Sequence, residues 1–238
     1  KSFNQAYSFQ PDMLQQGFLK LLKGSGLREN ALKYGIQYHS HPPYEVISTE
    51  HLGYDDILML KNIEELLENY YNSGRFKKSL SYAITKHFND PFEFYLSLFK
   101  YYDEKGYTDR ALKPWTLYTI LYNYVLDTFG MTITFNELLK YDYFINIGSP
   151  IPKCIDRFDH STIKAVVNSF IKDDNNIKNY MPELEFMTIR ERLKHISFEV
   201  FYIDVTGDLE EKENIVFSLK SIDREWEDRI ISFDMDEF

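Results

Sequence analysis

The spacing of apolar residues between residues 54 and 145 constrains the fold more than any other feature of this sequence. Apolar side chains recur there three and four residues apart, which is the period of one helix face. Each run ends at a glycine or a short polar turn, and short connections favour antiparallel neighbours. The sequence therefore predicts consecutive packed helices, at 57–71, 76–87, 91–105, 115–129 and from 134 onward.

Several predicted helices carry recognisable start signals. Asp90 is placed to cap a helix that has Pro91 at its first position and Glu93 at its third. A capping box, in which an N-cap hydroxyl and an acid three residues later bond each other's backbone N–H, fits Thr134 to Glu137 and again Thr188 to Glu191. These signals predict where the helices begin.

The remaining segments are shorter and more varied. Residues 27–34 read as a short helix that ends at Gly35, and residues 44–47 read as a short strand. A further helix is expected over 161–171, and Asp173 to Asn176 reads as a turn.

The pattern changes after residue 193. From His195 to Val205 apolar and polar residues alternate, with Ile196, Phe198, Val200 and Tyr202 on one face, and 215–219 and 230–233 alternate likewise. Alternation is the period of a β-strand, so this end of the chain predicts an antiparallel meander. The expected fold class is α+β, with a helical bundle over 54–192 and an acidic β-meander over 193–238.

The composition limits the partners. The 19 tyrosines and 19 phenylalanines predict an aromatic core. The net charge is −10, and residues 204–238 hold 12 acidic and 4 basic side chains. Binding to nucleic acid requires a basic face, so we expect no nucleic-acid partner. The acidic end is interpreted as solvation of a sheet edge or as a docking surface for a basic protein.

Cys154 is the only cysteine, which excludes an internal disulfide, an iron–sulfur cluster held by several thiolates and a multi-cysteine zinc site in this chain. No apolar run approaches the roughly 18 residues that a membrane span needs, and no signal peptide opens the chain. We expect a cytoplasmic protein that does not contact a membrane.

Three histidines form the best metal candidate. His39 and His41 are two residues apart, so in a strand both imidazoles would face one side, and His51 can supply a third ligand. The alternative is a polar loop with exposed histidines, which we favour. The thiol, carboxylates and imidazole between Cys154 and His160 are interpreted as structural, and the segment that begins at Asp173 lacks the glycine and glutamate of an EF-hand loop.

The turn Gly24-Ser25-Gly26 can present backbone N–H groups to an anion at the start of the helix predicted from Leu27. It lacks the lysine of a P-loop and the further glycine of a dinucleotide-binding turn, so a plain turn is the favoured interpretation. Gly24 and Ser25 are therefore weak candidates for cofactor contacts.

Several short segments go beyond generic patterns. Residues 13–28 read Met-Leu-Gln-Gln-Gly-Phe-Leu-Lys-Leu-Leu-Lys-Gly-Ser-Gly-Leu-Arg, and Pro-Pro-Tyr-Glu-Val-Ile-Ser-Thr-Glu follows at 42–50. Leu-Lys-Asn-Ile-Glu at 60–64 and Tyr-Tyr-Asn-Ser-Gly-Arg-Phe at 70–76 complete the set. Together they resemble the C-terminal region of cobalamin-binding-type radical SAM proteins, where a partial (β/α) barrel closes and a domain of unknown function follows.

The resemblance implies a division of the chain. Residues 1–53 would be the end of the barrel, with Gly17 to Lys23 as its last strand and Gly24-Ser25 as the turn behind it. Residues 54–238 would be the appended domain. The full-length protein would use a 4Fe–4S cluster and S-adenosylmethionine, together with cobalamin in members that bind it, and the rest of that protein would be the main partner of this region.

The chain lacks the Cys-x₃-Cys-x₂-Cys loop that holds such a cluster, so the resemblance assigns no catalytic residue to it. It also begins with Lys1 rather than Met, and we expect it to be a processed product or a piece of a longer protein. The expected role is a non-catalytic accessory region that shapes the active-site end of a barrel or docks a partner protein.

Two alternatives stay open. The first is a stand-alone interaction module that uses an acidic surface. The second is a small metal-dependent enzyme that uses His39, His41 and His51.

Overall fold

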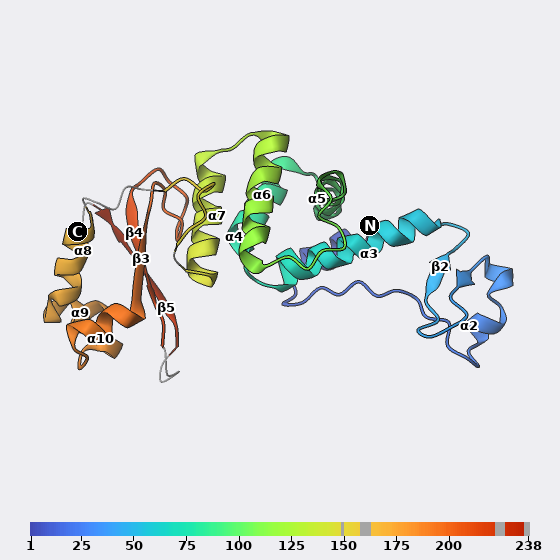
Figure 1. Cartoon of the computed structure of the whole chain (residues 1–238), viewed down its shortest axis with the longest axis horizontal. Coiled ribbons are helices and arrows are strands. Elements are labelled where there is room, and N and C mark those ends of the chain that lie inside the picture. The colour runs from blue at the N-terminus through green and yellow to red at the C-terminus, as the bar shows by residue number, and fades with distance from the viewer. Residues whose placement is uncertain (149, 158–162, 222–226, 236–238) are drawn as a thin grey trace. The chain divides into compact units, whose positions relative to one another are not determined.

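The computed structural model describes residues 1–148, 150–157, 163–221 and 227–235 (Figure 1). Its contacts divide the chain into an N-terminal unit, Lys1–Leu112, and a C-terminal unit, Lys113–Phe238. Helices and two antiparallel sheets confirm the α+β class. Within the described ranges, no helix is both long and apolar enough to cross a membrane. The predicted boundary at residue 53 separates the end of a barrel from an appended domain, and it stays a prediction.

The N-terminal unit is built on three consecutive helices. The runs expected at 57–71, 76–87 and 91–105 are helical. The elements of this unit, in chain order, are α1 Ser2–Ser8, α2 Gly26–Glu29, β1 Gln37–Tyr38, β2 Val46–Ser48, α3 Tyr54–Leu67, α4 Lys77–His87 and α5 Pro91–Lys105. The start of α5 is as predicted, because the Asp90 carboxylate accepts a hydrogen bond of 2.9 Å from the N–H of Glu93. Gly106 ends α5 with φ at +66°, a conformation that favours glycine.

The first 50 residues hold little regular structure. The expected helix 27–34 is split into α2 and a 3₁₀ turn at Leu32–Tyr34, and the strand expected at 44–47 is β2, which pairs antiparallel with β1. The strand that the resemblance implies over Gly17 to Lys23 is reduced to one antiparallel bridge, between Lys20 and Glu45. A barrel strand would pair in parallel with strands that the resemblance places elsewhere in the full-length protein, so the barrel strand stays a prediction.

The C-terminal unit begins with two helices, α6 Pro114–Phe129 and α7 Ile133–Asn146, which match the fourth and fifth predicted helices. Three short helices follow, α8 Ile163–Lys172, α9 Asp174–Tyr180 and α10 Ile189–His195. The predicted meander is confirmed as β3 Ile196–Phe201, β4 Asn214–Leu219 and β5 Arg229–Asp234, in the order β3-β4-β5.

The sheet of the C-terminal unit is covered by helices. Figure 1 shows α8, α9 and α10 on one side of it and α7 on the other. Phe217 of β4 lies directly opposite Phe198 of β3 and Ile231 of β5, and all three belong to the core shared with α8 and α9. Phe201 turns the other way, and its ring lies 5.9 Å from that of Tyr141 on α7. Every residue of β4 is therefore buried.

Two local predictions were wrong. Thr132, not Thr134, caps α7, because the Thr132 hydroxyl accepts a 3.1 Å hydrogen bond from the N–H of Phe135. The segment from Asp173 is not an isolated turn, since the Asp173 carboxylate caps α9 through the N–H of Asn175. The capping box from Thr188 to Glu191 is confirmed in both directions.

The cap of α5 gives a direct test of helix energetics. Replacing Asp90 with alanine is expected to lower the free energy of unfolding by about 1 kcal/mol, because the N–H of Glu93 loses its acceptor. Urea unfolding followed by circular dichroism measures the change. Lys100→Ala, an exposed substitution within the same helix, is the control and should change stability by less than about 0.5 kcal/mol. Equal losses of stability in the Asp90→Ala and Lys100→Ala variants would contradict a capping role of Asp90.

Candidate functional site

A pocket of about 620 Å³ lies in the N-terminal unit. It is bounded by the end of α1 and the residues that follow, by the turn after α3 and by one side of α4. Its aromatic wall consists of Tyr7, Tyr70 and Tyr71, and Leu80 and Ile84 of α4 add aliphatic surface. This size is within the range of about 300–1,000 Å³ that is usual for small-molecule sites.

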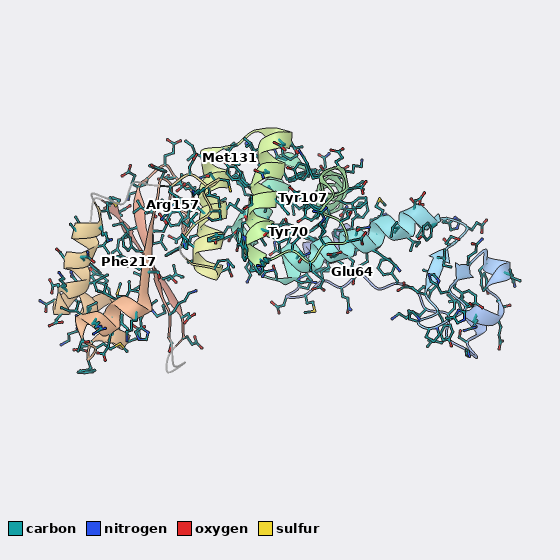
Figure 2. The ribbon with its side chains drawn as sticks, viewed as in Figure 1. Glu64, Tyr70, Tyr107, Met131, Arg157 and Phe217 are labelled. Carbon is teal, nitrogen blue, oxygen red and sulfur yellow. The ribbon has the colours of Figure 1, made fainter. Side chains whose placement is uncertain are left out.

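The tyrosine wall depends on an irregular helix end. After α3 the chain makes a π-helical turn, Glu68–Asn72, in which the N–H of Ser73 bonds the carbonyl of Glu68. The wider turn shifts the phase of the side chains by one residue, and such turns are frequent at functional sites. Tyr70, labelled in Figure 2, is buried and its hydroxyl lies 2.7 Å from that of Tyr102. The Tyr71 hydroxyl donates to the carbonyl of Pro11.

Burial determines the protonation of these tyrosines. Loss of hydration raises the pKa of Tyr70 and of Tyr95 well above the ordinary value, and it also raises the pKa of Tyr7 and of Tyr102. Smaller contributions come from neighbouring phenols, such as Tyr71 beside Tyr7. At neutral pH all of these hydroxyls are protonated, so they can donate and accept hydrogen bonds but cannot act as bases.

A buried ion pair joins α7 to the sheet in the C-terminal unit. The Lys140 ammonium lies 2.8 Å from the Glu137 carboxylate, and the side chains are 0% and 1% exposed. Lys140 donates to the carbonyl of Val200 at 3.0 Å, and the N–H of Tyr202 donates to Glu137 at 2.9 Å. Each charge is thus neutralised and also satisfies a backbone group at the end of β3.

Asn136 extends this polar network. Its amide donates to Glu137 at 3.0 Å, and its carbonyl oxygen accepts a 3.0 Å hydrogen bond from the N–H of Asp156. The buried amide thereby fixes the segment that carries Asp156 against the start of α7. The capping box predicted from Thr134 to Glu137 gave Glu137 a local partner, so this network was not predicted. Lys140, in register with Glu137 one helical turn later, was the signal that could have revealed the pair.

A second pocket, of about 550 Å³, opens beside this network. Four carboxylates line it, and they belong to Glu137, Asp156, Glu211 and Glu213. Burial raises the pKa of the Tyr202 phenol, and Glu137, Glu213 and Asp156 raise it further through their negative charge. Lys212 also lines the pocket and offsets part of this charge, and the carboxylates that remain leave an excess of negative charge that favours cations.

The structure places the predicted metal and anion residues at the surface. His39 follows β1, while His41 and His51 lie in bends, and all three are exposed. Among the described residues, no group of three or more histidine, cysteine or acidic side chains is arranged to hold a metal ion. Gly24 has φ at +79°, and the Ser25 hydroxyl accepts from the N–H of Arg28 and caps the single turn of α2.

Cys154 lies 4.0 Å from the hydroxyl of Thr119. Of the other groups considered beside it, Asp156 lines the acidic pocket, while Asp159 and His160 lie outside the described residues.

Comparison with known proteins shows the family. The model of a family described as "Protein of unknown function (DUF4080)" matches residues 32–217. The match covers more than three quarters of the chain, so the chain belongs to this family. No curated protein and no solved structure matches it.

The buried ion pair is expected to behave differently from a surface pair. Glu137→Gln keeps the shape of the side chain but leaves the Lys140 ammonium buried without a counter-charge, so we expect a loss of about 3 kcal/mol in the free energy of unfolding. Adding Lys140→Met should restore part of this loss because no unpaired charge remains. Denaturant unfolding of the single and double variants measures both effects.

The control is the exposed pair of Lys212 with Asp234. Lys212→Gln should cost less than about 1 kcal/mol, as surface pairs do. If Glu137→Gln lowers the free energy of unfolding no more than Lys212→Gln does, the pair of Glu137 with Lys140 does not behave as a buried ion pair.

The tyrosines give a pH test. Their raised pKa values favour the folded state as long as the hydroxyls stay protonated, so this contribution is complete below pH ~10 and is lost as pH rises above it. We expect tyrosinate absorbance to rise in two steps, with the buried group ionising only when circular dichroism reports unfolding. In denaturant all 19 tyrosines should titrate together. A single step in the folded protein would contradict the burial.

Proposed function

We propose that this chain is a non-catalytic accessory region of a radical SAM protein, which covers the active-site end of the barrel or docks a partner protein. The resemblance of residues 13–28 and 42–50 supports the proposal. The cluster, S-adenosylmethionine and, in members that bind it, cobalamin would be held by the rest of the protein, which is also the expected partner.

One structural observation carries this proposal. Nine of the 20 large apolar side chains that are exposed in the described part of the chain lie between Phe9 and Leu58, and none lies between residues 59 and 112. Leu22 is 58% exposed and Leu32 is 96% exposed. Exposed apolar side chains that form a contiguous patch usually mark an interaction site. Seven of the nine lie within residues 1–53, which resemble the end of a barrel, and Tyr54 and Leu58 lie on α3 directly after them.

The family match adds a second argument. It begins at residue 32, so all of the resemblance at 13–28 lies outside it, whereas the segment 42–50, the elements from α3 to β3 and most of β4 lie inside. This fits an appended domain that follows a different kind of segment.

The gene and the full-length protein provide the test. The reading frame upstream of Lys1 is expected to encode a Cys-x₃-Cys-x₂-Cys motif, and anaerobic reconstitution of its product with iron and sulfide should give the absorbance of a 4Fe–4S cluster. Absence of the motif would refute the proposal.

Leu32 tests the covering role, and Phe186 is its matched control because both side chains are 96% exposed. In the isolated chain neither Leu32→Asp nor Phe186→Asp should change stability much. In the full-length protein Leu32→Asp should lower the free energy of unfolding by about 1.5–3 kcal/mol, the value of burying one leucine, while Phe186→Asp should not. Equal effects in both proteins would show that residue 32 is not covered.

The acidic pocket favours the alternative of a stand-alone interaction module. Asp156, Glu211 and Glu213 would suit a basic partner there. This alternative predicts the opposite results, namely no cysteine motif upstream and no difference between the two aspartate variants. For the metal-dependent enzyme, the three histidines remain a prediction from sequence alone.

A further inference from the structure

The tyrosine-walled pocket of the N-terminal unit has a chemistry that the accessory role does not explain. One side of α4 faces it with residues three and four positions apart, and two kinds of side chain alternate there. Leu80 and Ile84 are buried and apolar, whereas Lys77, Ser81 and Thr85 are exposed and polar. The helix thus supplies an apolar floor and a polar rim along the same pocket.

The polar groups of the rim are available to a ligand. In the part of the chain that the structure describes, the side chains of Lys77, Ser81 and Thr85 make no hydrogen bond or ion pair with the protein. A Cβ added at Gly74 would lie 3.7 Å from Cε of Lys77, so the lysine stem runs beside a second lining residue. One ammonium and two hydroxyls therefore border the pocket as free donors.

The opposite wall restricts the charge of a ligand. Asp12 also lines the pocket. Burial raises the pKa of the Tyr71 phenol, and the negative charge of Asp12 raises it further. A second negative charge on a ligand would meet this carboxylate with nothing to offset it, because Lys77 is the one cationic side chain among the lining residues. The charges of Asp12 and Lys77 together favour a ligand that has a single anionic group, placed near α4.

The remaining surface suits an aromatic or aliphatic body. Tyr7 and Tyr71 have ring centroids 4.9 Å apart, and the two rings line the pocket together with the apolar side chains of Pro11 and Ile84. Aromatic rings favour offset or edge-on partners at such distances. The volume of about 620 Å³ accommodates a molecule of this kind.

We propose that this pocket binds a small amphipathic monocarboxylate, with its carboxylate on Lys77 and the hydroxyl of Ser81, and its apolar body between the tyrosine wall and Leu80. This inference is independent of the accessory role, since it concerns residues within one unit.

The probe is a fluorinated phenylpropionate, followed by fluorine NMR on the whole chain, and the comparison compound is the corresponding alcohol. The acid is expected to bind at least about tenfold more tightly than the alcohol, because an ionised acceptor strengthens the hydrogen bonds. Lys77→Met should remove this preference and leave the alcohol unaffected. Lys86→Met, an exposed lysine of the same helix that does not line the pocket, should change neither.

Ser81→Trp provides an independent variant. Residue 81 is exposed, so the fold should tolerate the ring, which circular dichroism checks, while the ring should block the pocket and abolish binding of both compounds. Three results would overturn the proposal: no binding of the acid, equal binding of acid and alcohol, or equal effects of Lys77→Met and Lys86→Met. None of them bears on the upstream cysteine motif, so this proposal and the accessory role fail separately.

Discussion

The pairing of Glu137 with Lys140 is the interaction on which the C-terminal unit depends. Transferring either charge alone out of water would cost several kcal/mol, so neither residue can be buried without the other. Their bonds to Val200 and Tyr202 use the same charges to satisfy backbone groups at the end of β3. An aliphatic pair would fill the space but leave that carbonyl and that N–H without partners. The ion pair therefore fixes both the position at which α7 contacts β3 and the distance between them.

Much of the fold follows from local sequence signals. The helix starts at Asp90 and Thr188 were predicted because a capping side chain acts within three residues of itself, and the meander was predicted because alternation has the same period in any sheet. Predictions failed where the role of a side chain depends on a partner far away in the sequence. Glu137 resembles a capping residue until β3 gives it a different partner 65 residues away.

The tyrosine pocket shows the same limit. Helical spacing predicts one apolar face of α5 that consists of Phe92, Tyr95, Leu96, Phe99 and Tyr102. Tyr95 and Tyr102 are buried, but Phe94 and Leu98 are buried as well, whereas Phe92 and Phe99 are only partly buried. The π-helical turn after α3 adds one residue to the helix, and no spacing in the sequence announces it. The weak candidates Gly24, Ser25, His39, His41 and His51 came from short motifs, whereas the pocket is assembled from segments up to 84 positions apart.

The burial of β4 has a consequence for the aggregation of the unfolded protein. Asn214–Leu219 is an uncharged stretch rich in Ile, Val and Phe, which is the composition of segments that stack into cross-β fibrils once they are released. Glu210, Glu211 and Glu213 come immediately before it, and Lys220 immediately after. Charges at these positions act as gatekeepers, because stacked copies would bring them into repulsive register. The acidity of this end of the chain thereby protects the unfolded protein against self-association.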